Sequence, residues 1–387
     1  MSGLIAVDNV CMRAPLMTTQ CSNVEGVPVS LCIQQKSARS MCLIREECRI
    51  LDPAPVHVSC RKMGLHLVTY LPATLQSLDL GENVMWYFRP EFPQNGPPPQ
   101  LKRVNLEKTE LWGMENVYLP PSTEELSLDG TRIVDLVFHD NLLSLRKLSV
   151  RDSQLSTIDG VQLPPKLEIL DVERSRIETL VLHNGLANLR VLKLDGNPIS
   201  AIDVRTRNLR LQELTISLPD LLILKDLPSS VTDLSVSTTA AEWTKFSAPA
   251  QLLRLRSSAS NIKALKALDF STATQLEEID LSNSRVSSIV GVKFPPTLMN
   301  LHLGNSNVEC LVVREKDLGI LAKVASLVVA SISTNACDTS TREGGSLLKI
   351  NNAGRWFEVV ALNDALYENR YFGGNLPQLQ SPPKQRA

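Results

Sequence analysis

The chain has 387 residues, of which 43% are hydrophobic and 21% charged, a composition typical of folded proteins rather than disordered ones. Its 40 Lys and Arg residues balance 41 Asp and Glu residues, for a net charge of -1. That balance excludes a general binder of nucleic acid or of acidic membranes, because both need an excess of positive charge. We therefore expect no nucleic acid among the partners. No apolar run approaches the roughly 20 residues that cross a bilayer, so we expect no transmembrane segment.

Residues 1–66 show no clear period, and we expect them to form a cap over the open end of a repeat array that begins at residue 67. They contain six of the eight cysteines, namely Cys11, Cys21, Cys32, Cys42, Cys48 and Cys60. An even set of closely spaced cysteines favours a disulfide framework, and hence an extracellular location. The first 20 residues lack a signal-peptide pattern and the chain has no Asn-x-Ser/Thr sequon, which favours a cytoplasmic location instead. The sequence leaves both locations open.

Residues 67–313 repeat with a period of 22. The segment Leu167–Ile177, LEILDVERSRI, has leucine-type residues at steps of three and two, then a small polar residue, then an aliphatic one. Leu189–Ile199, LRVLKLDGNPI, has the same pattern. The central positions of the predicted units are Leu78, Val104, Leu126, Leu148, Leu170, Leu192, Leu214, Leu234, Leu253, Ile279 and Leu301. A second period of 44 residues overlies the first and relates His139 to His183.

Each unit predicts one short strand and a compact return. Leu170 and Val172 alternate with Asp171, which indicates a strand with one buried face. Ile177 and Leu180 then turn inward on a return that is too short for a full helix and suits a 3₁₀ turn. A polar position comes after each strand, where a buried side chain bonds to backbone groups of the turn. It is occupied by Asn83, Thr109, Thr131, Ser153, Ser175, Asn197, Ser284 and Ser306.

Between Leu75 and Val313 this pattern closely resembles that of leucine-rich-repeat proteins of the 22-residue class. The resemblance implies an α/β leucine-rich-repeat solenoid, or horseshoe, of about eleven repeats. Its parallel β-sheet forms the concave face, its 3₁₀ and extended segments form the convex face, and non-repeat caps cover both ends. The Pro-Pro dipeptides before several units and the Cys-rich N-terminal segment are also similar to oomycete leucine-rich-repeat proteins, including ectodomains of receptor-like kinases. No Gly-rich loop and no HRD or DFG triplet of a kinase is present.

After Val313 the period ends, and we expect a helical C-terminal cap over residues 314–374. Asp317 is placed to begin a helix through Leu318–Ile332. A second helix is predicted over Arg355–Arg370, where four apolar residues recur at helical spacing. Residues 375–387 have the composition of a disordered tail.

The candidate binding surface is the concave face, where alternate strand residues point outward. The candidate partner-binding residues are Arg103, Glu107, Lys147, Arg151, Asp171, Glu173 and Lys193. Two interpretations are open: a charged recognition strip, or neighbouring rows such as Asp171 and Lys193 that only neutralise each other. Because Asp171 is expected to be exposed, its replacement by alanine should cost less than about 0.5 kcal/mol, against about 2–5 kcal/mol for Leu170→Ala.

Other residue clusters have structural explanations. Six aromatic residues lie around the proline-rich insertion: Trp86, Tyr87, Phe88, Phe92, Trp112 and Tyr118. They either form a recognition patch or pack the insertion and the N-terminal cap onto the array. The other candidate is a zinc site formed by Cys48, His57, Cys60 and His66. The spacing of these residues gives it only weak support, because no Cys-x-x-Cys pair is among them. His139 and His183 repeat with the array and are expected to be structural. No catalytic, cofactor or metal motif is present, so we expect neither a cofactor nor a metal.

Three functions are consistent with the sequence. The first is a non-catalytic module or scaffold that binds a protein partner through the repeat surface. The second is the ectodomain of a receptor-like kinase whose signal peptide and kinase domain lie outside this chain. The third is an enzyme with a site in the non-repeat ends, which would require a polar pocket there.

Overall fold

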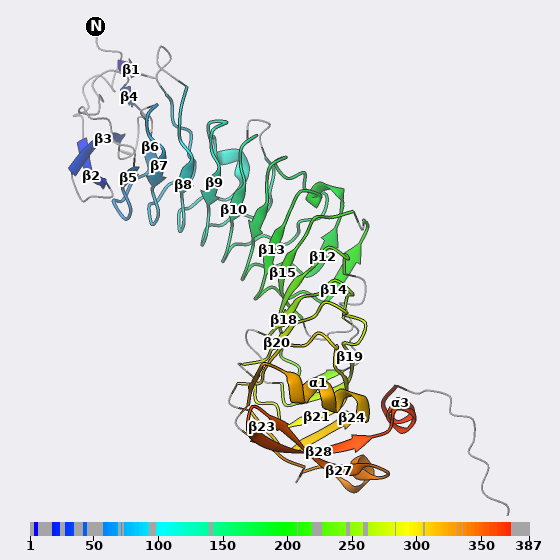
Figure 1. Ribbon diagram of the computed structural model, residues 1–387. Helices are drawn as coiled ribbons and strands as arrows, with labels where there is room; N and C mark the ends of the chain where they lie inside the picture. The colour runs from blue at the N-terminus through cyan, green and yellow to red at the C-terminus, as the bar shows by residue number, and fades with distance from the viewer. Residues whose placement is uncertain are drawn as a thin grey trace, which may run out of the picture. The chain divides into compact units, whose positions relative to one another are not determined.

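The computed structural model describes the backbone of residues 4–6, 18–23, 28–34 and 42–44, and then residues 57–372 with short gaps. The gaps are 69–70, 72, 93–97, 139–141, 207, 219–226, 245–247, 258–261, 283, 305, 330 and 335. The chain divides into two compact units, residues 1–211 and 212–387, which we call unit 1 and unit 2. Both consist mainly of stacked parallel strands (Figure 1).

Seven parallel strands form the main sheet of unit 1. In chain order and spatial order they are β5 (His57–Ser59), β7 (Ser77–Asp79), β8 (Arg103–Asn105), β9 (Glu125–Ser127), β10 (Lys147–Ser149), β11 (Ile169–Asp171) and β13 (Val191–Leu194). Each strand and the return segment after it form one rung of the stack. The central residues pair in register, for example Leu148 with Leu126 and Leu170, and their side chains are buried in the core. This period-two burial is caused by the alternation of leucine and polar residues along each strand.

The first edge of this sheet is occupied by the N-terminal segment. The antiparallel hairpin of β2 (Thr18–Asn23) and β3 (Pro28–Gln34) pairs through β2 with β5, and β6 (Leu67–Val68) pairs with β3. A separate antiparallel pair joins β1 (Leu4–Ala6) to β4 (Cys42–Ile44). Strand β5 is already a parallel rung, in which Val58 pairs in register with Leu78 of β7.

The return segments of unit 1 carry extended and 3₁₀ structure. Strands β12 (Thr179–Leu182) and β14 (Ala201–Val204) pair in parallel, and the 3₁₀ helices are η2 (Met114–Asn116) and η3 (Asn184–Leu186). Ile177 and Leu180 are fully buried, as predicted. The return is therefore extended at Leu180 and becomes 3₁₀ only in the next residues.

Every rung of unit 1 ends in the same left-handed turn. The residue four positions after each central residue has a φ between 50° and 73°: Lys62, Glu82, Lys108, Gly130, Asp152, Arg174 and Gly196. The turn directs the chain out of the strand and into the return segment. Only two of these positions hold glycine, the residue for which this conformation is least costly.

The described part of unit 2 contains two large sheets and one separate strand pair. The first is all parallel and consists of β15 (Glu213–Ser217), β16 (Asp233–Ser237), β18 (Arg254–Arg256), β20 (Glu278–Asp280), β22 (Asn300–His302) and β25 (Ser326–Val328). The second contains the parallel strands β17 (Glu242–Thr244), β19 (Ala264–Asp269), β21 (Ser288–Lys293), β24 (Cys310–Arg314) and β28 (Arg355–Leu362), with β27 (Ser346–Asn352) antiparallel to β28. Strands β23 (Asn307–Val308) and β26 (Ser331–Ile332) pair separately.

Two sequence predictions for unit 2 are wrong in detail. The central residue of β18 is Leu255 rather than Leu253, because Leu252 and Leu255 are buried and satisfy the leucine step of three. The helix predicted over Arg355–Arg370 begins as strand β28, and only its second half is helical, in α3 (Asp364–Phe372). A continuous apolar stretch does not distinguish a doubly buried strand from a helix.

The helix predicted over Leu318–Ile332 is also wrong beyond its first turns. The 3₁₀ helix η5 (Glu315–Asp317) leads into α1 (Leu318–Lys323), after which β25 adds one more parallel rung around Leu327. The remaining helix, α2 (Thr339–Arg342), precedes β27. No described helix is long and apolar enough to cross a membrane. The disordered tail predicted for 375–387 lies outside the described residues.

The C-terminal elements close around a buried cluster. Cys310 and Cys337 form a disulfide whose Cα atoms are 4.8 Å apart, and both pack with Tyr367 of α3. The Tyr367 hydroxyl donates a hydrogen bond to the carbonyl of Val292 at 2.8 Å. Burial of that side chain raises its pKa well above the usual value. The cluster is apolar, as expected for a packed end of a repeat array.

Candidate functional site

The sheet face of unit 1, formed by the outward side chains of its parallel strands, carries a shallow groove. The groove has a volume of about 430 Å³ and runs over five strands, from β7 to β11. Its lining residues are Ser77, Leu78, Asp79, Arg103, Val104, Asn105, Glu125, Leu126, Ser127, Asp129, Lys147, Ser149, Arg151 and Asp171. This is the face on which the sequence placed the candidate partner-binding residues. Four of those seven residues line the groove.

Two of the candidate residues form ion pairs with neighbouring rungs. Arg103 donates from Nε to the carboxylate of Glu125 on the next strand, at 3.2 Å. Glu107 accepts from Arg61, which also pairs with Glu82 at 2.8 Å. The Arg103–Glu125 pair is largely exposed and contributes on the order of 0–1 kcal/mol, whereas the Arg61–Glu107 pair is half-buried. Their charges are already partly compensated within the protein.

Arg151, Asp171 and Glu173 form a more buried cluster. Nε of Arg151 donates to Oδ2 of Asp171 at 2.8 Å, and this bond raises the pKa of Arg151. Asp171 is only 3% exposed and also accepts from the backbone N–H of Glu173 at 3.3 Å. Burial and the neighbouring Asp171 carboxylate raise the pKa of Glu173, and Arg151 opposes that shift. Asp171 thus takes part in the turn. Its carboxylate forms an ion pair with Arg151 and not with Lys193, the partner that the sequence suggested.

Lys147 and Lys193 differ from the other five candidates. Lys147 is exposed, and Lys193 is half-buried in register with Asp171. Among the described residues, neither ammonium group has a carboxylate within ion-pair distance, because Glu125 and Asp171 are held by arginines. Lys193 acts only at longer range, where it opposes the rise in the pKa of Glu173.

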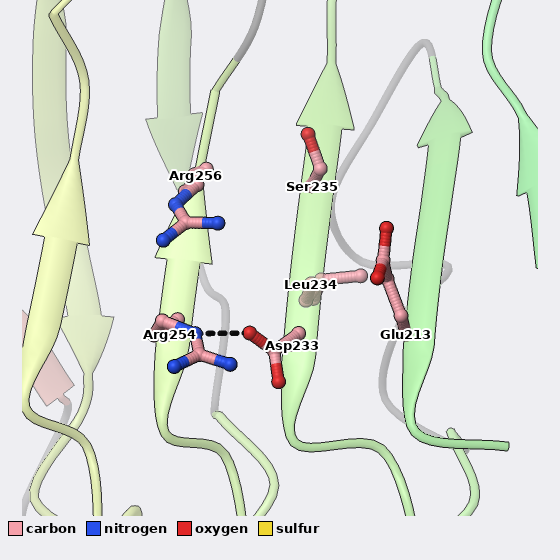
Figure 2. Close-up of a pocket in the computed structure, with 6 residues that line it drawn as sticks. All are labelled: Glu213, Asp233, Leu234, Ser235, Arg254 and Arg256. Atoms are coloured by element: carbon pink, nitrogen blue, oxygen red, sulfur yellow. Dashed lines mark hydrogen bonds and ion pairs between the residues drawn. The ribbon is translucent and has the colours of Figure 1, made fainter. Parts of the chain in front are cut away.

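A second, smaller pocket lies on the first sheet of unit 2. It has a volume of about 140 Å³ and is lined by Glu213, Asp233, Leu234, Ser235, Arg254 and Arg256 (Figure 2). Arg254 forms an ion pair with Asp233 across the strands, and this bond raises its pKa. Arg256 pairs outward with Glu278 at 3.0 Å. The pocket brings together charges that pair with each other, and its lining contains no nucleophile activated by a base.

The rungs are held together by a ladder of buried polar side chains. All eight residues of the predicted polar position are buried. Asn197 accepts from the N–H of Ile177 at 3.0 Å and donates to the carbonyls of Val172 and Leu194 at 2.8 and 2.9 Å. Asn83 makes the same kind of contacts in the first rungs. Ser and Thr reach fewer partners, as predicted: the Thr131 hydroxyl donates to the carbonyl of Leu128 within its own rung.

In-register leucine strands, a return segment and this polar ladder together define the repeat. The chain has the leucine-rich-repeat fold. No family model matches it, and no curated protein matches it either.

Several solved structures have a similar arrangement. The leucine-rich-repeat domain of APL1B is 17% identical, with coverage of 76% of this chain and 88% of that one and a TM-score of 0.38. YopM, a leucine-rich effector protein from Yersinia pestis, is 21% identical, with coverage of 70% and 82% and a TM-score of 0.36. The mouse RP105/MD-1 complex is 18% identical, with coverage of 70% and 48% and a TM-score of 0.44. What those proteins bind does not transfer to this chain at such identities and TM-scores.

Among the aromatic residues around the proline-rich insertion, some pack against the repeat array and others are exposed. Phe88 is 1% exposed and bridges to Val117 on the next rung, so it packs the insertion against the array. Trp86 and Trp112 are 43% and 53% exposed and occupy equivalent return positions, with Val134 in the next rung at 44%. Packing therefore explains Phe88 but leaves a row of exposed apolar side chains, which the aliphatic spacing of the sequence did not reveal.

The two remaining candidates are structural. Cys60 is buried and disulfide-bonded, so it has no thiolate for the zinc site considered from the sequence. No group of three or more metal-ligating side chains occurs among the residues that the structure describes. His183 Nδ1 accepts from the N–H of Gly185 at 3.1 Å and Nε2 lies 3.0 Å from the carbonyl of Ile158, which fixes the return segment. Its repeat partner His139 lies outside the described residues.

Proposed function

We propose that this protein is a non-catalytic recognition module that binds a protein partner on the sheet face of unit 1. The observation that carries the proposal is the groove over five consecutive strands. Most of its lining side chains point away from the core, so the solenoid does not need them for packing. A polar groove that carries both acidic and basic side chains provides a surface for recognition. It contains no group of residues arranged for chemistry.

A second candidate function is supported by the cysteines. Cys60, Cys310 and Cys337 are all disulfide-bonded, and stable disulfides form in oxidising compartments. This supports the ectodomain or secreted form of the same binding role, in which the partner is extracellular. The enzyme alternative required a polar pocket in the non-repeat ends. The described C-terminal end instead packs an apolar cluster around Tyr367, which gives that alternative no support.

Filling the groove tests the proposal. In the full chain, Ser127→Trp places an indole in the groove, where Ser127 is half-buried. Ser156→Trp is the matched control, because Ser156 is exposed on a return segment. A partner would be captured with the wild-type protein, identified by mass spectrometry, purified, and titrated against all three proteins by calorimetry.

We expect Ser127→Trp to weaken binding by more than tenfold and Ser156→Trp to leave it unchanged. Circular dichroism would verify that both variants fold. Equal affinity of the two variants would show that the partner binds elsewhere.

A further inference from the structure

The first sheet of unit 2 ends in a rung that is incompletely covered. The central residues of the parallel rungs from β5 to β22 are each at most 3% exposed. Leu327, the central residue of β25, is only half-buried, and the next residue, Val328, is 45% exposed. Among the described residues, β25 is the last strand of its sheet. A terminal rung needs a cover, because the apolar core of a repeat array otherwise meets water there.

The second sheet of unit 2 ends in a strand with an open edge. Strand β27 pairs with β28 on one side, and no described strand pairs with its other side (Figure 1). It has seven residues, whereas β25 has three. Leu347 and Leu348 of this strand are 62% and 39% exposed, and Trp356 of β28 is 67% exposed. The described protein thus leaves large apolar side chains and a long strand edge in contact with solvent.

The open edge lies beside the open rung. Asn352, the last residue of β27, donates hydrogen bonds to the carbonyls of Leu321 and Val324 at 3.0 and 2.8 Å. Val324 is two residues before the start of β25. An occupant of the β27 edge therefore lies next to the rung that lacks a cover.

The geometry of the hairpin identifies the backbone groups on the open edge. Ala353 and Gly354 form a two-residue turn with φ values of 49° and 84°, so the flanking residues Asn352 and Arg355 form a hydrogen-bonded pair. Hydrogen-bonded and non-hydrogen-bonded pairs alternate along an antiparallel ladder. The backbone groups that point away from β28 are therefore the N–H and C=O of Leu347, Lys349 and Asn351.

This edge lacks the features that usually prevent strand pairing, namely a proline, a bulge or an unpaired lysine. Strand β27 contains no proline, and it pairs with β28 residue for residue from Ser346 to Asn352. Its one charged residue, Lys349, lies 3.7 Å from the carboxylate of Glu358 on β28. A second strand that approaches this edge meets backbone donors, backbone acceptors and leucine side chains.

From this self-complementary edge we infer that the protein forms a dimer in which β27 pairs antiparallel with β27 of a second copy. A two-fold axis brings the donors of each edge opposite the acceptors of the other and joins the two sheets into one. A second copy supplies every group that the edge requires, because the same strand carries both the donors and the acceptors. The dimer uses unit 2, so the inference goes beyond the recognition face of unit 1.

Charge selects the register of the two strands. A register with Lys349 opposite Lys349 brings like charges together and is unfavourable. A shift of two residues places Lys349 opposite Leu347 of the second copy, and Leu348 opposite Leu348. The reverse shift places Lys349 opposite Asn351 and leaves Leu347 opposite the turn at Ala353. The first shift covers both leucines of each strand and is the register of the inferred dimer.

Charged substitutions at Leu347 test both the dimer and its register. Sedimentation velocity of the full chain, from nanomolar to high micromolar concentration, would measure the dimer Kd of wild type, Leu347→Lys and Leu347→Glu. Leu347 is largely exposed, so neither substitution removes core packing. Leu143→Lys and Leu143→Glu are the matched controls, because Leu143 is an exposed leucine of unit 1. Circular dichroism would verify that each variant folds.

We expect wild type to dimerise. Leu347→Lys places a lysine opposite Lys349 at two symmetric positions and should weaken the dimer about fivefold or more. Leu347→Glu places a carboxylate opposite the same lysine and should give a dimer at least about fivefold tighter than that of Leu347→Lys. The two Leu143 variants should have the Kd of wild type.

A disulfide cross-link locates the centre of the interface. Leu348→Cys places two thiols in a non-hydrogen-bonded pair, where Cα atoms are about 4.5 Å apart, within the range of a disulfide. Mild oxidation should give a covalent dimer on a non-reducing gel, and mass spectrometry would locate the link at position 348. Leu143→Cys and wild type, treated in the same way, should give no such dimer.

A wild type that is monomeric at every concentration overturns the inference. So does a dimer that Leu347→Lys and Leu347→Glu weaken equally, or one that Leu348→Cys does not cross-link. If wild type is monomeric and the two Leu347 variants bind the captured partner with different affinities, another protein covers the edge and the inference is wrong. Ser127→Trp should leave the dimer Kd unchanged, so loss of partner binding in that variant tests the recognition face of unit 1 separately.

Discussion

Arg151 and Asp171 form an ion pair across adjacent strands, in which Nε of Arg151 donates to a carboxylate that is only 3% exposed. The sequence places both residues at outward positions and suggests that both are solvated. Asp171 instead lies at the end of its strand, where it also accepts from the N–H of Glu173. One of the candidate binding residues therefore stabilises the turn, and the arginine that covers it is partly committed as well.

The first prediction concerns that pair. Asp171→Ala should lower the free energy of unfolding by about 1–3 kcal/mol, because it leaves the Arg151 guanidinium and the Glu173 N–H without their acceptor. The sequence alone predicts less than about 0.5 kcal/mol for an exposed residue. Urea denaturation would measure the loss. Glu168→Ala is the control, since Glu168 and Arg146 pair at 2.7 Å in an exposed position and contribute on the order of 0–1 kcal/mol. Equal losses for the two variants would contradict the assigned role of Asp171.

The repeat core is predictable from sequence because its residues act through periodicity. Leu148 and Leu170 share a register that the 22-residue step alone imposes, and Asn197 bonds as its residue type suggests. The rungs around Val58 and Leu327 were missed for the opposite reason. Cys60 stands where a leucine is expected in the first, and the second lies inside an apolar run that suits a helix equally well.

The candidate site was less predictable because pairing depends on distances between strands. Register places Lys193 beside Asp171, but geometry gives that carboxylate to Arg151 from the other side. Whether a lysine forms an ion pair therefore depends on whether another cation already pairs with the neighbouring carboxylate. The boundaries predicted for the two caps remain predictions.

The second prediction concerns the polar ladder. Asn197→Ala should lower the free energy of unfolding by about 1–3 kcal/mol, because three buried backbone groups lose a partner. Asn188→Ala is the matched control: its side chain donates to the carbonyl of Pro165 at 3.0 Å but is exposed, and we expect a loss below about 0.5 kcal/mol. Ser175→Ala should fall between the two, because Ser175 bonds to Ser153 at 2.9 Å and makes only long contacts otherwise. Chemical denaturation of all three variants checks this order, and an Asn197→Ala protein as stable as Asn188→Ala would refute it.

The third prediction uses the left-handed turn that ends each rung of unit 1. Lys108 has a φ of 51°, a conformation that costs a residue with a Cβ about 1–2 kcal/mol. Lys108→Gly should therefore leave the free energy of unfolding unchanged or raise it by up to about 1 kcal/mol, after the entropy of glycine is subtracted. Lys147→Gly, in a strand, should lower it by about 0.5–1 kcal/mol. Thermal denaturation compares the two, and similar losses for both would contradict the turn.

The same turn makes the reverse change costly. Gly196 has a φ of 73°, and a Cβ built there lies 2.7 Å from Cγ of Arg174 and 3.3 Å from its Cα. We expect Gly196→Ala to lower the free energy of unfolding by about 1–2 kcal/mol. A Gly196→Ala protein at least as stable as Lys108→Gly would show that backbone conformation does not limit this position.

The last prediction tests the disulfide of the C-terminal cluster. Cys310 and Cys337 close a loop with a sequence separation of 27, and their link restricts the unfolded chain. The double variant Cys310→Ala/Cys337→Ala should lose roughly 2–4 kcal/mol of unfolding free energy under oxidising conditions. A reductant should lower the Tm of wild type by more than that of the double variant, because the double variant has no Cys310–Cys337 bond to lose. The disulfide of Cys60 is present in both proteins. Mass spectrometry of unreduced peptides provides the direct measurement, and free thiols at both positions in the purified native protein would remove the main support for an oxidising compartment.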